Sequence, residues 1–216
     1  MHSILVVNPK GGSGKTTVAT NLAGLFAARR YRIALADMDR QLSATGWLKR
    51  RPETLPIIIP WTAQTDKKNI KSLDPQWVII DSPAGVHGEK LTNLVRRADL
   101  IVVPVAPSAF DMEATKDFLL ALRDEKPVRK GESPVAVVGN RVDSRTIVAI
   151  ELEEFLKSLQ LPILSYLRDT QNYIHCARNG YSLFDFAPSR VEQDLQQWRP
   201  IARWLQRQVQ PLNAAK

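Results

Sequence analysis

Cysteine is almost absent from this sequence, because Cys176 is the single one in 216 residues. A chain with one cysteine forms no internal disulfide, which favours a reducing compartment and predicts that Cys176 fills space in the core. No apolar run approaches the ~20 residues that a membrane-spanning helix needs. The first ten residues lack the charged segment of a secretion signal and lead directly into a strand pattern, so we expect a cytoplasmic protein.

Internal repeats, low-complexity tracts and linkers are also missing, and the chain length suits one domain spanning 1–216. Hydrophobic residues make up 44% and charged residues 24%, which is ordinary for a soluble protein. The formal net charge of +8 is less ordinary. Basic residues are in excess within 1–60 and 160–216, which favours a polyanionic partner such as nucleic acid or an anionic membrane surface.

Apolar runs rich in Val and Ile alternate with helical patterns along the whole chain. The expected strands lie at 3–8, 32–37, 55–61, 77–81, 100–105, 134–140 and 161–167. The expected helices lie near 15–29, 88–97, 111–125, 145–159, 170–178 and 190–208. Continuously apolar strands are typical of parallel sheets buried on both faces. The alternation predicts a doubly wound α/β domain of about seven mostly parallel strands, with ligands at the carboxyl ends of the strands.

The stretch VVNPKGGSGKTT, 6–17, has the features of a phosphate-binding loop that leads into a helix. Its glycines let backbone N–H groups approach phosphates closely, and the helix N-terminus adds a partial positive charge. We expect Lys15 to reach the β- and γ-phosphates and the Thr16 hydroxyl to ligate Mg²⁺. The expected phosphate contacts are Gly11, Gly12, Ser13, Gly14, Lys15, Thr16 and Thr17. Two features depart from the common loop, because Pro9 stands where it has glycine and Lys10 is an added positive charge.

Acidic residues follow two other expected strands. In ADMDRQ, either Asp37 or Asp39 is expected to orient the attacking water while the other approaches the metal's hydration shell. Asp81, at the end of WVIID, is expected to hold Mg²⁺ directly or through water. The expected switch residues are Asp37, Gln41, Pro83 and Gly85. Each carboxylate also has a simpler interpretation, as part of a solvated loop or as a turn or helix cap.

Asn140 ends the strand pattern of VVGNRVD and is expected to hydrogen-bond a purine edge. The same four residues, Asn-Arg-Val-Asp, are similar to the N-K-x-D motif with which many GTPases read guanine. Asp143 would then pair with the guanine amino group, but an aspartate before the next helix is also a common N-cap. Spacing alone leaves both roles of Asp143 open.

Lys10 directly before two glycines, followed by DMDRQ, IIDSPAG and NRV in this order, resembles the ParA/MinD family of deviant Walker ATPases. The resemblance covers residues 4 to about 205 and implies a P-loop NTPase that binds ATP and Mg²⁺. In that family the extra lysine contacts the nucleotide of the other subunit, so Lys10 is expected to act across an ATP-sandwich homodimer. The simpler alternative is that Lys10 is one more basic loop residue.

The resemblance also assigns roles to individual residues. It places Asn140 on the adenine, makes Asp39 the hydrolytic aspartate, and brings Arg168 and Asp169 into the adenine pocket. The expected catalytic residues are Lys10, Lys15 and Asp39, and the expected metal ligands, partly through water, are Thr16, Asp39 and Asp81. Residues 104–115 resemble the segment that faces the partner subunit. Arg40 stands where many members have proline, which leaves the geometry of its loop open.

Small members of the family without a helix-turn-helix domain position plasmids, chromosomal regions or protein assemblies. This resemblance implies slow ATP hydrolysis stimulated by a ParB-like or other cargo-linked protein, and non-specific DNA binding with nucleoid association in the ATP state. Arg199, Arg203 and Arg207 recur every four residues on the expected basic C-terminal helix and are the candidate DNA contacts, although a solvated helix face is equally consistent. Further basic clusters are Arg29/Arg30/Arg32, Lys49/Arg50/Arg51 and Lys67/Lys68/Lys71.

Two other classes of function fit the loop less well. A MinD-like protein docks on membranes through a C-terminal amphipathic helix, but here Pro211 is expected to interrupt the tail and Trp198 and Trp204 to pack on the domain. Metabolic enzymes such as reductase components, metal pumps and ATP-dependent ligases share the loop. A single cysteine and no Cys/His cluster argue against iron–sulfur chemistry and metal pumping.

Overall fold

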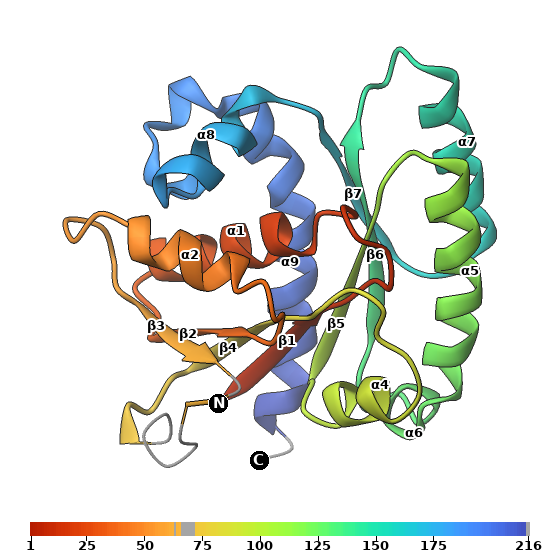
Figure 1. The fold of residues 1–216 in the computed structure, drawn as a ribbon, viewed down its shortest axis with the longest axis horizontal. Coiled ribbons are helices and arrows are strands. Elements are labelled where there is room, and N and C mark those ends of the chain that lie inside the picture. The colour runs from red at the N-terminus through yellow and green to blue at the C-terminus, as the bar shows by residue number, and fades with distance from the viewer. Residues whose placement is uncertain (63, 66–71, 215–216) are drawn as a thin grey trace.

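A sheet of seven parallel strands lies at the centre of the computed structural model, which describes residues 1–62, 64–65 and 72–214 (Figure 1). The order across the sheet is β3-β2-β4-β1-β5-β6-β7. The strands are β1 (His2–Val6), β2 (Ile33–Asp37), β3 (Ile58–Thr62), β4 (Trp77–Asp81), β5 (Leu100–Val105), β6 (Val135–Val142) and β7 (Ile163–Arg168). The doubly wound parallel fold predicted from the sequence is therefore confirmed, and each expected strand differs from the observed one by only a few residues.

The sheet separates two hydrophobic cores, because successive side chains of a strand point to opposite faces. In β1, Ile4 and Val6 belong to one core and Leu5 to the other, and all three are fully buried. Helices α1 (Lys15–Ala28), α2 (Ser43–Arg50), α8 (Gln171–Asn179) and α9 (Glu192–Ala214) cover the first face. Helices α4 (Gly88–Val95), α5 (Ala109–Asp124) and α7 (Ile147–Ser158) cover the second face (Figure 1).

Among the α-helices in the described residues, α2 and the one-turn α6 (Lys126–Arg129) were not predicted from the sequence. Helix α2 is short and has few apolar residues, of which Ala44 and Trp47 are buried. Its first turn is held from the end of β2, since the buried Asp37 carboxylate accepts a hydrogen bond from the Thr45 N–H at 2.7 Å. A contact between a strand end and the next helix leaves no apolar period in the sequence.

The C-terminal helix is longer than expected. Helix α9 continues to Ala214, so the expectation that Pro211 interrupts it is wrong for the backbone path. The expected packing of the two tryptophans is confirmed, because Trp198 is 1% exposed and Trp204 lies partly buried against the same core.

None of the helices in the described part of the chain combines the length and the apolar character that a membrane span requires. The basic cluster Lys67/Lys68/Lys71 lies outside the described residues.

Candidate functional site

The loop between β1 and α1 has the backbone that phosphate binding requires. Gly12 and Gly14 have φ of +82° and +94°, in the left-handed region where glycine is favoured. Gly14 is also the N-cap of α1 and no side chain caps this end, so the first N–H groups of the helix are not covered by a cap. A Cβ at Gly14 would lie 2.0 Å from Asn140 Nδ2. Both the positive φ and the lack of space therefore exclude a larger residue at this position.

Lys15 lies against the loop that it follows. Its side chain is 7% exposed and its Nζ donates a hydrogen bond to the Lys10 carbonyl oxygen at 2.8 Å. Burial lowers the pKa of Lys15, while the carboxylates of Asp81, Asp39 and Asp111 act in the opposite direction. The lysine is thus a cation held in a partly desolvated position, where a phosphate would be attracted strongly.

Asn8 anchors the loop to the neighbouring elements, and sequence reasoning did not identify it. This residue is fully buried, and its Nδ2 donates to the Pro104 carbonyl and to Thr115 Oγ1 at 2.9 and 3.0 Å. Its Oδ1 accepts from the Lys10 N–H at 2.9 Å, so the backbone of Lys10 is connected to β5 and α5. The sequence signal for Asn8 is a single polar side chain at the end of an apolar strand, because a buried side-chain amide needs hydrogen-bond partners.

Thr16 and Asp81, both expected to hold Mg²⁺, are in contact at the end of β4; their role as ligands stays a prediction. The Thr16 hydroxyl donates to Asp81 Oδ2 at 2.8 Å. Asp81 is fully buried, and its Oδ1 has no hydrogen-bond partner among the described residues. Burial raises the pKa of Asp81 to about 7, while the hydrogen bond from Thr16 opposes the rise. A buried carboxylate oxygen without a partner beside a hydroxyl is a donor set that suits Mg²⁺, which binds oxygen ligands and takes most of the others from water and phosphates.

Asp37 ends β2 and Asp39 lies in the loop that follows, and the two carboxylates are held differently. Asp37 is 1% exposed and its carboxylate accepts the N–H groups of Thr45 and Asp39, at 2.7 and 3.2 Å. Asp39 is only half-buried, and its Oδ1 accepts the Gln41 N–H at 2.9 Å. Asp37 therefore orders the start of α2, while Asp39 is the more accessible of the two carboxylates.

The loop after β4 is bonded directly to the phosphate loop. Gly85 has φ of +66°, and its N–H donates to the Pro9 carbonyl oxygen at 2.8 Å. Pro83 precedes it and is partly buried. The predicted switch segment and the predicted phosphate loop are therefore in contact through a backbone hydrogen bond.

Asn140 lies beneath the phosphate loop. It is 2% exposed, and its Nδ2 donates to the Ser13 carbonyl oxygen at 3.1 Å. Asp143 does not cap the following helix, because the N-cap of α7 is Thr146 and the Asp143 carboxylate accepts from the Arg145 guanidinium at 2.8 and 2.9 Å. These hydrogen bonds lower the pKa of Asp143 to about 2. The assignment of Asn140 to a purine edge stays a prediction.

Arg168 and Asp169, at the end of β7, were expected to line an adenine pocket. Their hydrogen bonds go to α9 and β6 and not to the phosphate loop. The Arg168 guanidinium donates to Asp194 Oδ1 and to Gln193 Oε1 in α9, both at 2.5 Å. Asp169 is exposed, and its N–H donates to the Val142 carbonyl. A cavity of about 210 Å³ does open between α1, α2 and α8, beside Thr16 and Thr17.

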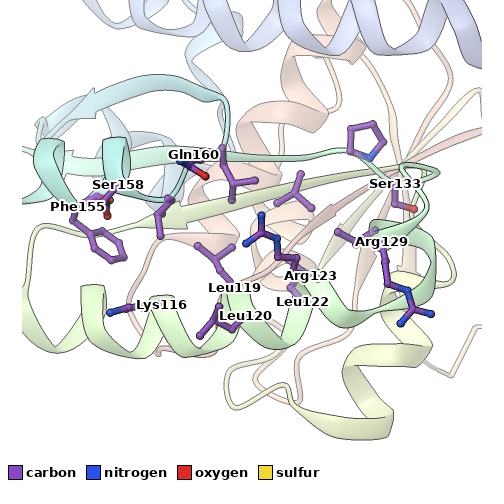
Figure 2. Close-up of a pocket in the computed structure, with 15 residues that line it drawn as sticks. Lys116, Leu119, Leu120, Leu122, Arg123, Arg129, Ser133, Phe155, Ser158 and Gln160 are labelled. Atoms are coloured by element: carbon purple, nitrogen blue, oxygen red, sulfur yellow. Dashed lines mark hydrogen bonds between the residues drawn. The ribbon is translucent and has the colours of Figure 1, made fainter.

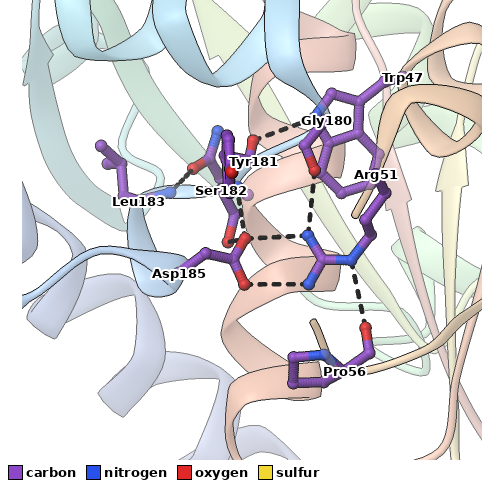
Figure 3. Close-up of polar contacts among 9 residues, drawn as sticks. Trp47, Arg51, Pro56, Gly180, Tyr181, Ser182, Leu183 and Asp185 are labelled. Carbon is purple, nitrogen blue, oxygen red and sulfur yellow. Dashed lines mark hydrogen bonds and ion pairs between the residues drawn. The ribbon is translucent and has the colours of Figure 1, made fainter. Parts of the chain in front are cut away.

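Helix α2 is attached to the segment after α8 by a buried ion pair (Figure 3). Arg51 donates to both oxygens of Asp185 at 2.9 and 3.0 Å, and also to the carbonyl oxygens of Gly180 and Pro56. The side chains of Arg51 and Asp185 are 6% and 2% exposed. Sequence reasoning placed Arg51 in a basic surface cluster, and this assignment is wrong because the guanidinium is fully engaged inside the protein.

The candidate DNA contacts form an exposed row on α9. Arg199, Arg203 and Arg207 are all exposed, and none of them makes an ion pair with any residue that the structure describes. The opposite face of the helix is buried through Trp198, Ile201 and other apolar residues. This arrangement leaves three cations available to a polyanion and no apolar face for a membrane along this part of the helix.

Comparison with known proteins gives a consistent result. Residues 4–183 match the CobQ/CobB/MinD/ParA nucleotide binding domain. The chain is 27% identical over 210 residues to "Maintenance of carboxysome distribution protein A" of Gloeobacter kilaueensis, covering 94% of each chain. The protein of the same name from Halothiobacillus neapolitanus is 29% identical, with 84% of this chain and 86% of the relative covered.

Solved structures share the fold at lower sequence identity. An ATP complex of McdA from Cyanothece has a TM-score of 0.70 at 16% identity, covering 94% of this chain and 96% of that one. MinD from Aquifex aeolicus has a TM-score of 0.71 at 18% identity, covering 95% and 97%. These similarities establish a common architecture for the chain.

Proposed function

The chain belongs to the CobQ/CobB/MinD/ParA nucleotide-binding family, and from this membership we propose that it is an ATP-dependent positioning switch. In this proposal two copies enclose two ATP molecules, bind DNA non-specifically as the ATP dimer, and return to monomers after hydrolysis. The observation that carries the proposal is the convergence of Lys15, Thr16 and the unpartnered Asp81 oxygen at one glycine-rich loop.

The phosphate loop supplies the binding energy for the nucleotide. The N–H groups of 11–17 and the amino end of α1 surround the phosphates, and Lys15 leaves the Lys10 carbonyl to contact them. Thr16 and Asp81 would hold Mg²⁺, which neutralises charge that develops on the phosphates. Asp39 orients the attacking water, since it is the half-buried carboxylate of its loop and Asp37 is already committed to α2.

Lys10 makes dimerisation depend on the nucleotide. Its backbone is fixed through Asn8, and its partly exposed side chain remains free to extend toward a second copy. A lysine delivered to the phosphates of the partner's nucleotide gains a charge-assisted contact that exists only when ATP is bound. Hydrolysis would remove that contact and weaken the dimer.

The cargo is proposed from the relatives. Proteins named for carboxysome distribution match most of this chain, which favours a protein assembly over a plasmid as the object that is positioned. A cargo-linked activator would stimulate hydrolysis locally. The exposed arginines of α9 would connect the ATP dimer to DNA through a salt-dependent contact with phosphates. A MinD-like role at a membrane is the alternative, and the burial of the apolar face of α9 argues against it.

Three substitutions test the proposal with purified protein. Lys15→Ala should abolish ATP binding, and Asp39→Ala should bind ATP but accumulate as a dimer on DNA. Lys10→Ala should bind ATP as a monomer, while Lys90→Ala, an exposed lysine on α4, serves as the matched control. Light scattering and co-sedimentation with DNA or with anionic vesicles, each with ATP or ADP, give the readout. An ATP dimer of Lys10→Ala, hydrolysis by Asp39→Ala at the wild-type rate, or ATP-dependent vesicle binding without DNA binding would contradict it.

A further inference from the structure

A cavity lies between α5 and α7 (Figure 2). None of the described residues that line it belongs to the phosphate loop. Its volume is about 580 Å³, within the roughly 300–1,000 Å³ typical of ligand pockets. Its floor is apolar and includes Leu119, Leu122, Val135 and Phe155. We call it the α5–α7 cavity, after the two helices between which it lies.

The charges around this cavity have one sign. Lys116, Arg123 and Arg129 line it, and among the described residues no aspartate or glutamate does. None of these three cations forms an ion pair with a described residue, although the nearby Lys130 and Lys157 both do. Three unpaired cations around an apolar floor present the complement of an acidic partner that also carries apolar side chains.

The spacing of the cations favours a peptide over a small anion. Lys116, Leu119, Leu120 and Arg123 follow the i, i+3, i+4, i+7 pattern, so they share one face of α5 (Figure 2). Positions seven apart on a helix are separated by about 10 Å along its axis. One head group does not reach both cations, whereas a segment with several carboxylates does. Leu120 is 55% exposed and extends the apolar surface beyond the cavity.

We infer that the α5–α7 cavity is a docking site for a partner's acidic segment, with leucine or phenylalanine side chains entering the cavity and carboxylates meeting Lys116, Arg123 and Arg129. The segment would lie along the groove between the two helices, which is a common mode of peptide recognition.

The place of the cavity in the fold separates it from the nucleotide. Pro134 and Val135 lie at the amino end of β6, whereas the phosphate loop lies at the carboxyl ends of the strands. A partner bound here would not cover the phosphate loop, so binding should not need ATP. If the proposed ATP sandwich forms, the cavity stays open in it; this one expectation rests on the proposed function.

The test uses the whole 216-residue chain without nucleotide, so its failure is independent of the proposed function. The probes are fluorescein-labelled 14-residue peptides that carry leucines at helical spacing between glutamates, in several registers. Two comparison sets replace every glutamate by lysine or every leucine by serine. Fluorescence anisotropy should detect binding of the acidic leucine peptides alone, and Arg123→Glu should weaken it at least tenfold. Arg178→Glu, the same charge change at an exposed site on α8, should alter it less than twofold.

Three results would overturn the inference. The first is that no acidic leucine peptide binds more tightly than its lysine or serine version. The second is that Arg123→Glu leaves peptide binding unchanged but weakens binding of labelled duplex DNA, which would assign the cations to nucleic acid. The third is that Leu120→Ser alters self-association in sedimentation velocity without affecting the peptides, which would make this face an interface between copies.

Discussion

Replacing Arg51 tests how strongly the buried ion pair with Asp185 stabilises the fold. Arg51→Met would remove four hydrogen bonds and leave the Asp185 carboxylate buried without its cation. Breaking a buried pair on one side costs about 3–5 kcal/mol. Asp185 keeps the N–H and hydroxyl of Ser182 as donors, at 2.6 and 2.7 Å, so we expect a loss near 3 kcal/mol.

Urea unfolding followed by circular dichroism measures this loss directly. The midpoint should fall while the m-value stays constant, because the folded and unfolded surfaces barely change. The matched control is Arg145→Met, which breaks an ion pair with Asp143 whose side chains are 87% and 39% exposed. Solvent screens an exposed pair, which then adds little to stability, so the control should be nearly as stable as the wild type.

A double-mutant cycle adds a second criterion. Arg51→Met with Asp185→Leu removes both charges, so the penalty for an unpaired buried carboxylate disappears. The double variant should therefore be destabilised by less than the sum of the single variants. If Arg51→Met costs no more than Arg145→Met, or if the single effects simply add, the two charges do not depend on each other as the structure indicates.

Three further predictions concern the site and the C-terminal helix. The raised pKa of Asp81, about 7, means that charging this residue disfavours the nucleotide-free fold as pH rises from about 4 to 7. Asp81→Asn lacks this effect, so its unfolding free energy relative to the wild type should increase between pH 5 and 7 and level off above 8; a decrease over that range would refute the assignment. Gly14→Ala should lower the unfolding free energy by about 2 kcal/mol or more, because φ is +94° and the Cβ meets Asn140, whereas Gly11→Ala, with nothing within 4 Å, should have little effect without nucleotide. Trp198→Ala should cost about 3–5 kcal/mol, since the indole is 1% exposed and donates to the Tyr173 hydroxyl, and the loss should exceed that of Trp204→Ala at a partly buried site; equal thermal shifts would contradict this packing.

The features that were predictable from the sequence are those with a local pattern. Apolar runs predicted all seven strands, and the loop from Gly11 to Thr16 with Asp81 predicted which residues meet at the strand ends. Helix α9 was predicted from its alternating arginine and apolar faces, and its extension through Pro211 was not. Helix α2 was missed because its start depends on Asp37 and its packing on Trp47, whose Nε1 donates to the Tyr181 carbonyl.

By itself, the sequence determined the class of fold and the position of the glycine-rich loop after the first strand, because spacing along a strand or turn fixes these locally. The roles of the lysines and carboxylates at that loop stay predictions. Only the tertiary structure decided which polar groups have hydrogen-bond or ion-pair partners inside the protein and which have none. Asp37 and Arg51 are occupied by α2 and Asp185, whereas one oxygen of Asp81 and the cations of the α5–α7 cavity have no partner among the described residues. The physical reason is that a hydrogen bond or ion pair joins groups far apart in the chain, so whether a charge is satisfied depends on what the fold brings beside it.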